Sequence, residues 1–344
     1  MTRRRARGAA RCCGAPSGAL PAARGVQSRT LQELDFLLGV ADVARLGALR
    51  FRWKGRERFE APAPEAVPSI MHVRRLLGAS DRTLRMAESE EDLRLLLAPG
   101  SSLGGARPKA SVVEANGALS IAKFPKEQDE YPLERWEAVA LRLAERSSIA
   151  AARARVMEVD GRIALIVRRF DRADEGRIPY LSAMAMLDRA DGERASYPEI
   201  ADAIASYGAR ADCDRRELYR RLAFNVLVSN VDDHLRNHGF LWGGREGWRL
   251  SPAFDLNPTP VDVRERTLTT SIDLEDGTCD LALVLEVAPF FGLGALEARS
   301  LVRSVADGVG AWRTVASALG AGRSEIDRMF SAFDHDDARG ASRL

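Results

Sequence analysis

The strongest constraint on the fold is a change of sequence character near Asp171. Before it, residues 110–124 alternate like a β-hairpin, with Asn116-Gly117 as a type I′ turn, and residues 162–170 form an apolar strand. After it, the apolar spacing is mostly helical, with loop and short strands between residues 230 and 270. Candidate helices cover residues 181–189, 197–208, 214–229, 280–291, 296–318 and 323–333. We predict an α+β fold with a small β-rich N-terminal lobe and a larger, all-helical C-terminal lobe.

Composition separates a tail from the body of the chain. Residues 1–29 carry seven arginines and no acidic residue, and they are rich in Ala, Gly and Pro. We predict a disordered tail, and we favour an over-extended translation start over an organelle-targeting peptide as its origin. Without these seven arginines, the 51 basic residues fall to 44 against 49 acidic ones. The basic excess therefore does not indicate a nucleic-acid-binding body.

Cysteine usage and apolar runs bear on the compartment. Cys12 and Cys13 are adjacent, Cys213 and Cys279 stand alone, and no C-x-x-C pair is present. This pattern predicts reduced thiols and a cytoplasmic protein. The apolar runs are far too short to span a bilayer, so we expect no membrane partner.

The densest polar cluster is the run from Asn230 to His238, which follows an apolar helix. Burying such a run of carboxylates, imidazoles and amides without a function is costly, although a solvated loop of turn formers would look similar. Asp232 and Asn237 have the spacing of the base and the metal ligand in the catalytic loop of protein kinases, without the preceding His-Arg. Downstream, Asp255 follows an apolar Phe and is a second candidate oxygen ligand, although an aspartate after a strand is often only a cap.

A glycine-rich stretch with nearby lysines is a candidate phosphate site. The stretch 101–109 contains Gly104-Gly105 and ends in Lys109, and adjacent glycines let backbone N–H groups approach phosphate oxygens. It matches neither standard phosphate-loop motif, and a surface loop is the alternative. Lys123 ends the second strand of the hairpin, and Glu137 on the next helix is a candidate partner. The chain has only four lysines among its 51 basic residues, so a lysine at this position is informative.

Taken together, these motifs resemble the HipA family of serine/threonine kinase toxins, which pair with a helix-turn-helix antitoxin. The motifs that carry the resemblance occur in family order over roughly residues 30 to 335: Gly-Gly-Ala-Arg-Pro-Lys109, Ile-Ala-Lys123-Phe-Pro, Trp-Glu137, Val-Arg-Arg-Phe170-Asp171-Arg172, Asn230-x-Asp232-Asp233-His234-x-Arg236-Asn237 and Leu-Ser-Pro-Ala-Phe-Asp255. The loop from Asn230 to Asn237 is the most specific of them.

The resemblance implies a two-lobed, protein-kinase-like fold and a role for each matching residue. Asp232 would be the catalytic base, and Asn237 and Asp255 would hold Mg²⁺. Ser102 would be the site of autophosphorylation, which silences the kinase by ejecting the glycine loop. ATP would be bound by residues from both lobes: Gly104, Gly105, Ala106, Arg107, Lys109, Lys123, Arg168, Phe170, His234 and Asn237.

The resemblance also implies a domain order and partners. Residues 30–98 would be a remnant of an N-terminal subdomain plus a linker helix, 99–172 the ATP-binding lobe, 173–335 the catalytic lobe and 336–344 a tail. The partners would be ATP, a protein substrate of the translation machinery and a HipB-like antitoxin, with DNA bound only through the antitoxin.

The chain departs from the family pattern at three points. Arg236 stands where lysine is usual, and Arg168 where an acidic residue can occur. The N-terminal β subdomain of full-length members is replaced by the arginine-rich tail, as expected for a truncated gene, a wrong start or a split toxin. One alternative is therefore a catalytically inactive, truncated module that still binds an antitoxin. Another is a metal hydrolase that uses Asp232, Asp233, His234 and His238.

Overall fold

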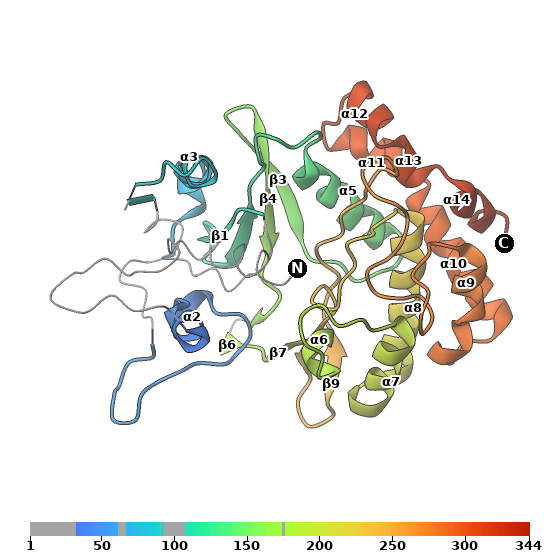
Figure 1. Cartoon of the computed structure of the whole chain (residues 1–344), viewed down its shortest axis with the longest axis horizontal. Coiled ribbons are helices and arrows are strands. Elements are labelled where there is room, and N and C mark those ends of the chain that lie inside the picture. Colours follow the sequence, from blue (N-terminus) through green and yellow to red (C-terminus); the bar gives the residue numbers. More distant parts are fainter. Residues whose placement is uncertain (1–31, 61–66, 90, 93–106, 174–175) are drawn as a thin grey trace. The chain divides into compact units, whose positions relative to one another are not determined.

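The computed structural model describes residues 32–60, 67–89, 91–92, 107–173 and 176–344 (Figure 1). The predicted tail, Ser102 and the glycine pair at 104–105 lie outside these residues, as does Ala106. Contacts divide the chain into two compact units, which we call unit 1 (residues 1–130 and 155–177) and unit 2 (residues 131–154 and 178–344). None of the helices in the described part is long and apolar enough to cross a bilayer.

Unit 1 is built on a four-stranded sheet with the order β1-β2-β4-β3. Its strands are β1 (Lys109–Val113), β2 (Leu119–Lys123), β3 (Ala154–Val159) and β4 (Arg162–Arg168). Strand β2 pairs antiparallel with both β1 and β4. Four consecutive residues of β4, 164–167, are buried, as expected for a central strand that is covered on both faces.

A helix covers the sheet of unit 1. Ile70 and the helix α3 (Val73–Leu84) place Val73, Leu76 and Leu77 against the sheet residues Ala110, Val112, Ala122, Phe124, Val159, Ala164 and Ile166. All of these side chains are at least nine-tenths buried. The remaining elements of unit 1 are short: α2 (Glu33–Gly39), η1 (Asp42–Ala44), η2 (Ile70–His72), β5 (Arg172–Ala173) and β6 (Gly176–Arg177).

The predicted β-hairpin is confirmed, but its turn is not type I′. That turn needs a positive φ at both central residues, and only Gly117 has one, at 80°. Instead, Gly117 N–H donates to the Glu114 carbonyl (2.9 Å), and Glu114 N–H donates to the Ala118 carbonyl (2.9 Å). The Asn116 side chain accepts from Ala118 N–H (3.0 Å). The connection is therefore a three-residue turn that ends in a left-handed glycine.

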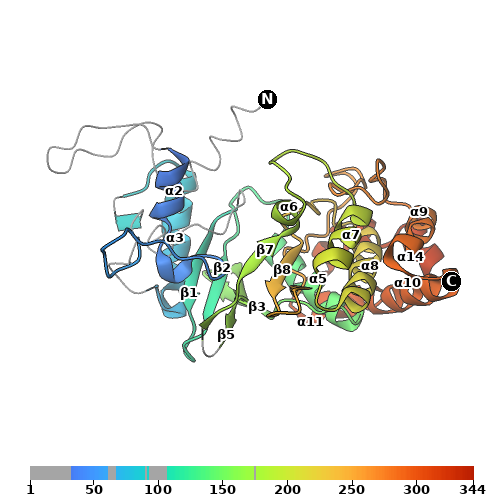
Figure 2. The ribbon, with the colours of Figure 1, turned by 90° about the horizontal axis from the view of Figure 1, so that it is seen from below.

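Unit 2 is mostly helical around the long helix α8. Figure 2 shows α7, α8 and α10 side by side, and α5 packs on α10 and α11. The helices are α5 (Leu133–Arg146), α6 (Ala183–Met186), α7 (Tyr197–Tyr207), α8 (Ala211–Leu227), α9 (Leu281–Glu286), η3 (Ala288–Phe291), α10 (Ala295–Val309), α11 (Trp312–Ala318), α12 (Arg323–Arg328), α13 (Phe330–Phe333) and α14 (Asp336–Ala341). The helix α5, which the sequence placed in the β-rich lobe, thus packs within unit 2.

The larger lobe is not all-helical, because unit 2 contains a three-stranded antiparallel sheet, two strands of which lie in the segment 230–270 where short strands were predicted. Strand β8 (Gly239–Trp242) pairs with β7 (Tyr180–Ser182) and with β9 (Trp248–Leu250). Trp242 and Trp248 are opposite each other with ring centroids 5.2 Å apart, a cross-strand aromatic pair that stabilises the β8–β9 hairpin. This sheet begins directly after His238 and so anchors the end of the polar run.

Candidate functional site

The polar run begins where α8 ends, at a residue with unusual backbone geometry. The second half of α8 is buried, and Val228 caps it. Ser229 then has a φ of 53°, a left-handed conformation that is uncommon for a serine and that is enriched at functional sites. Its carbonyl accepts from Thr259 N–H (3.1 Å), and its hydroxyl accepts from Arg266 Nε (3.1 Å). The turn into the loop is therefore fixed from outside the loop.

Two adjacent aspartates of the loop lie in opposite environments. The side chain of Asp232 is 59% exposed and lies 3.3 Å from Nη1 of Arg264. The side chain of Asp233 is 2% exposed. Asp232 can therefore meet a ligand in solvent, whereas Asp233 belongs to the core.

Asn237 closes the loop over the backbone of Asp232. Its Nδ2 donates to the Asp232 carbonyl (3.1 Å), and its backbone N–H donates to the His234 carbonyl (2.8 Å). Because only the amide nitrogen can donate to a carbonyl, the Oδ1 atom of Asn237 is at the other end of the amide and keeps its acceptor capacity. The structure thus brings the predicted base and one predicted metal ligand together in a single turn.

The second predicted metal ligand, Asp255, also has a left-handed backbone, with a φ of 58°. The segment before it is held by two hydrogen bonds, from Ala253 N–H to the Ala150 carbonyl (2.7 Å) and from Ala152 N–H to the Ala253 carbonyl (2.8 Å). Asn257 Nδ2 donates to both the carbonyl and Oδ1 of Asp255, at 3.2 Å each. The backbone N–H of Asn257 in turn donates to Asn230 Oδ1 (2.9 Å), which joins this segment to the start of the polar run.

The other predicted residues of the polar run have mixed environments. Nδ1 of His234 is buried, and it has no hydrogen-bond partner among the residues that the structure describes. Arg236 is exposed and pairs with Asp191 (2.5 Å). His238 is buried, with its Nε2 2.8 Å from Asp233 Oδ1. Because Asp233 and His238 face each other in the core, while Asp232 is exposed, this arrangement does not favour a metal hydrolase that uses all of them.

The predicted phosphate-binding lysines of unit 1 are direct neighbours. Lys109 on β1 and Lys123 on β2 are opposite each other in the antiparallel register, so their side chains lie on the same face of the sheet. Arg107, which precedes β1, makes a two-pronged ion pair with Asp129 (2.9 and 2.5 Å).

The residues predicted next to adenine lie at the end of β4. Arg168 is exposed, and Phe170 is partly buried. Four predicted residues, Ser102, Gly104, Gly105 and Ala106, lie outside the described residues.

Sequence reasoning missed the residues that support the loop. Asn225, Tyr197, Asn257 and Arg264 all make hydrogen bonds to residues of the loop or to one another. The only sequence signal is the presence of a polar amide, Asn225, in the apolar half of α8.

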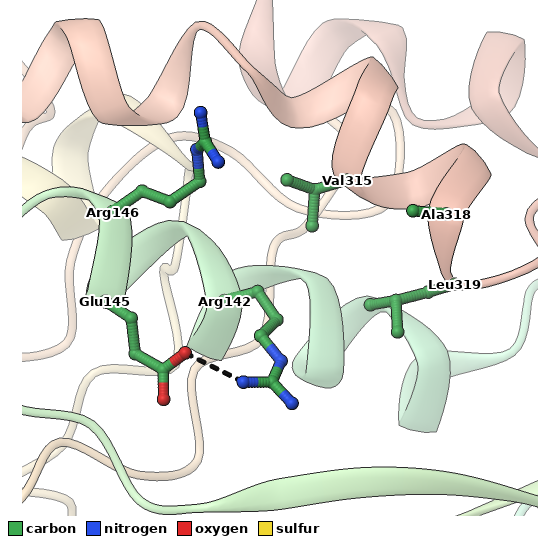
Figure 3. A pocket seen from close by; sticks show the side chains of 6 residues that line it. All are labelled: Arg142, Glu145, Arg146, Val315, Ala318 and Leu319. Carbon is green, nitrogen blue, oxygen red and sulfur yellow. Dashed lines mark hydrogen bonds and ion pairs between the residues drawn. The ribbon is translucent and has the colours of Figure 1, made fainter.

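A cavity of about 430 Å³ lies between α5 and α11 in unit 2, and Figure 3 shows its lining. The lining residues are Arg142, Glu145, Arg146, Val315, Ala318 and Leu319. None of the predicted site residues lines it, so it does not add to the site above.

Comparison with known proteins places this site in a family. Residues 101–331 match the model of the HipA-like C-terminal domain. The protein "Putative kinase Y4mE" of Sinorhizobium fredii is 28% identical over 256 residues, which cover 66% of this chain and 57% of the relative. "Putative kinase Y4dM" of the same organism is 30% identical over 122 residues, 35% of this chain and 29% of the relative.

The fold is also similar to a solved structure. HipA of Shewanella oneidensis MR-1, solved with HipB and its operator DNA, matches with a TM-score of 0.57 at 17% identity, over 70% of this chain and 64% of that chain. The chain thus spans less than two thirds of each of these three relatives. Since the family model covers 231 of its 344 residues, from 101 to 331, the chain belongs to the HipA-like C-terminal domain family.

Proposed function

We propose that the chain is an ATP-dependent serine/threonine protein kinase of the HipA type and the toxin component of a type II toxin–antitoxin system. One observation carries this proposal: an exposed Asp232 sits in a turn closed by Asn237, and the turn is joined through Asn230 to the segment that presents Asp255. A base and two oxygen ligands from two segments are what phosphoryl transfer to a hydroxyl requires.

In the proposed reaction, Asp232 takes the proton of the substrate hydroxyl as its oxygen bonds to the γ-phosphorus of ATP and the bond to the β–γ bridging oxygen breaks. Its high exposure leaves the carboxylate accessible to a protein side chain, once Arg264 releases it. Because the side-chain nitrogen of Asn237 donates to the loop backbone, its side-chain oxygen keeps its acceptor capacity and would be a ligand for a cation.

The residues present fit Mg²⁺, which takes oxygen ligands and usually only one or two from protein carboxylates. Asn237 and Asp255 would hold it, and the ion would neutralise charge on the phosphates. The buried Nδ1 of His234, which has no hydrogen-bond partner within the described part of the chain, is the kind of atom that a bound nucleotide or its water would satisfy. Lys109 and Lys123, which already face the same side of the sheet, would hold phosphate oxygens together with residues 104–107. Arg168 and Phe170 would lie next to adenine.

Regulation and partners complete the proposal. Ser102 would be autophosphorylated, which adds about −1.5 to −2 charges beside the ATP phosphates and would favour loss of the nucleotide. The HipA structure that this chain resembles contains HipB and operator DNA. We propose a comparable helix-turn-helix antitoxin for this chain, with DNA bound only through it, a protein substrate of the translation machinery and a cytoplasmic location.

The test is transfer of radiolabelled γ-phosphate by the purified chain with Mg²⁺, followed by mass spectrometry of the labelled serine. We expect labelling at Ser102, and a loss of about 10² to 10⁴ in rate for Asp232→Asn, because a general base typically contributes that much. The variant should remain folded, since the side chain is mostly exposed.

The matched control is Asp212→Asn, which removes an exposed aspartate paired with Arg215 (2.7 Å) elsewhere in unit 2. It should keep full activity. A wild-type chain that transfers no phosphate would favour the inactive antitoxin-binding module instead, and an active Asp232→Asn variant would remove Asp232 as the base.

A further inference from the structure

A chain of buried polar groups runs through unit 2 beneath the candidate site. Asn257 N–H donates to Asn230 Oδ1 (2.9 Å), and Asn230 Nδ2 donates to Asn225 Oδ1 (3.0 Å). Asn225 Nδ2 donates to the Tyr197 hydroxyl (2.8 Å), which donates to Asp233 Oδ2. Asn225, Asn230, Tyr197 and Asp233 are each at most 3% exposed. We call these groups the polar relay.

The direction of every hydrogen bond in the polar relay is fixed. A backbone N–H can only donate, so Asn230 must accept from Asn257 with its oxygen and donate with its nitrogen. The same reasoning applies to Asn225, so the Tyr197 hydroxyl accepts from this amide and is left to donate to the carboxylate of Asp233. Burial, and then the neighbouring Asp233, hold the pKa of Tyr197 well above its ordinary value, so the hydroxyl keeps its proton.

Asp233, at one end of the polar relay, contacts both His238 at the end of the loop 230–238 and Thr270 outside it. His238 Nε2 lies 2.8 Å from Asp233 Oδ1, and the Tyr197 ring packs edge-on against His238 with centroids 5.3 Å apart. The Asp233 carbonyl accepts from the backbone N–H (3.0 Å) and the hydroxyl (2.7 Å) of Thr270. Asp233 is adjacent in sequence to the candidate base, and His238 to a candidate metal ligand.

Tyr197 itself is held rigidly at the first turn of α7. Ser196 caps the helix and exchanges hydrogen bonds with Glu199 in a capping box, in which Glu199 accepts from Ser196 N–H (2.8 Å). Tyr197 N–H donates to the Ser271 carbonyl (2.9 Å), so α7 is bound to the residue next to Thr270. The phenol is therefore placed by two contacts that do not involve the site.

Such a relay is not an economical way to stabilise a core, because apolar side chains of similar volume are often as stable as buried polar or charged groups. What it provides is a fixed geometry between two segments. One end is the backbone two residues after Asp255, and the other is the residue beside Asp232.

We propose that Tyr197 is a positioning residue that, through the polar relay, sets the geometry of Asp232 and Asn237 relative to Asp255. This inference rests on the proposed kinase function. It predicts that loss of one hydroxyl, which touches neither ATP nor the substrate, slows phosphate transfer.

The test compares Tyr197→Phe with Tyr219→Phe. Tyr219 is also fully buried, and its hydroxyl donates to the Val284 carbonyl (3.0 Å), so Tyr219→Phe removes a buried phenol hydroxyl outside the relay. We expect Tyr197→Phe to lower kcat about 10- to 100-fold with little change in KM for ATP, since small misplacements of reacting groups cost up to about 100-fold. Tyr219→Phe should lower Tm less, because it removes one hydrogen bond and not two, and should leave kcat unchanged.

A second variant tests the relay as a unit. Asn225→Leu interrupts the polar relay at a different hydrogen bond. The double variant Tyr197→Phe/Asn225→Leu should therefore lose no more kcat than the more damaging single variant. Multiplicative losses, or a Tyr197→Phe enzyme that is as active as Tyr219→Phe, would overturn the inference.

Backbone hydrogen exchange separates this inference from the proposed function. Exchange of residues 230–238 should be faster in Tyr197→Phe than in Tyr219→Phe, whether or not the chain transfers phosphate. An inactive wild type with this difference in exchange would refute the kinase proposal and keep the relay, whereas equal exchange in the two variants would refute the relay.

Discussion

Asp171 in unit 1 and Asp233 in unit 2 are both almost completely buried, with side chains 1% and 2% exposed, but their partners differ. Asp171 accepts from the guanidinium groups of Arg169 (2.6 Å to Nε) and Arg172 (2.7 Å to Nη1), and from Gly47 N–H (2.7 Å). Asp233 is surrounded by a phenol, an imidazole and a threonine that binds its carbonyl.

The charged partners in unit 1 hold distant parts of the chain together. Arg169 also donates to the Ala44 carbonyl (3.1 Å), and Arg172 donates to the Arg45 carbonyl (2.7 Å). The ion cluster therefore ties the segment around residues 43–47 to the end of β4. Burial alone would raise the pKa of Asp171, but the hydrogen bonds from Arg169 and the adjacent positive charges bring it below its ordinary value.

The difference separates two uses of a buried carboxylate. The guanidinium groups in unit 1 supply strong, charge-assisted hydrogen bonds to a carboxylate and to backbone carbonyls, which suits the attachment of a segment. The amide and phenol donors in unit 2 supply hydrogen bonds whose direction is fixed at every step, which suits the placement of a loop. Changes in the first network should therefore appear in stability, and changes in the second in activity.

The largest effect on stability is expected for Asp171→Asn. Removing the charge leaves Arg169, whose side chain is 2% exposed, without its counter-ion, and breaking a buried pair in this way costs about 3–5 kcal/mol. Hydrogen exchange should show loss of protection in residues 162–168 before the helices of unit 2. The control is Asp81→Asn, whose pair with Arg162 (2.5 Å) is more exposed to solvent. A cost below 1 kcal/mol for Asp171→Asn would contradict the attachment role.

A second prediction concerns acid, and it rests on His335 in unit 2. Its Nε2 lies 3.2 Å from the Leu227 carbonyl, and its Nδ1 accepts from Ala338 N–H (3.3 Å), so both contacts need the neutral ring with its proton on Nε2. Burial, followed by the charge of Arg266, lowers the pKa of His335 to about 4.

The difference in proton binding between the folded and unfolded chain sets the direction in which pH changes stability. Between about pH 6.5 and 4, His335 is protonated in the unfolded chain but not in the folded chain. The free energy of unfolding therefore decreases as the pH is lowered, by roughly 3 kcal/mol at most over this window. The stabilisation that comes from the depressed pKa of Asp171 is lost at lower pH, because it decreases only as the pH falls below 3.8, the ordinary pKa of an aspartate. Between about pH 6.5 and 4, acid should therefore destabilise unit 2 through His335, whereas the ion cluster of unit 1 should stay intact.

The variant His335→Asn tests this difference. Asparagine can still cap α14 through its oxygen, but it does not titrate. Urea unfolding at pH 7 and pH 4.5 should show a clearly smaller loss of stability for this variant than for the wild type. An equal loss in both would mean that another group causes the acid sensitivity.

Whether a feature of the fold or of the site could be predicted from the sequence depends on how far apart in sequence its interacting residues lie. The hairpin, the long buried helix α8 and the loop with Asp232 and Asn237 are local patterns, and the structure contains all of them. The type I′ turn and the continuous helix at 296–318 were wrong, because propensity does not fix the φ of Asn116 or the break at Gly310 between α10 and α11.

The relay could not have been predicted at all. Tyr197 finds Asn225 28 residues away and Asp233 36 residues away, and nothing local to Tyr197 specifies either contact. The three-residue strand β7 is likewise too short to carry a periodic signal, and it is defined only by its pairing with β8.

The smallest expected effect concerns the candidate metal ligands, whose positions we propose the polar relay sets. Asp255→Asn and Asn237→Ala should each weaken ATP binding about tenfold with Mg²⁺, or about 1.4 kcal/mol, and should change it little without Mg²⁺. Asparagine at position 255 tolerates the left-handed φ of 58°, so stability should be nearly unchanged. The matched control is Asp188→Asn, an exposed aspartate of unit 2 with a φ of 51°. Calorimetric titrations that give equal Mg²⁺-dependent affinity for wild type and both variants would show that these oxygens hold no ion. The polar relay of unit 2 would then serve, like the ion cluster around Asp171 in unit 1, only to hold segments of the chain together.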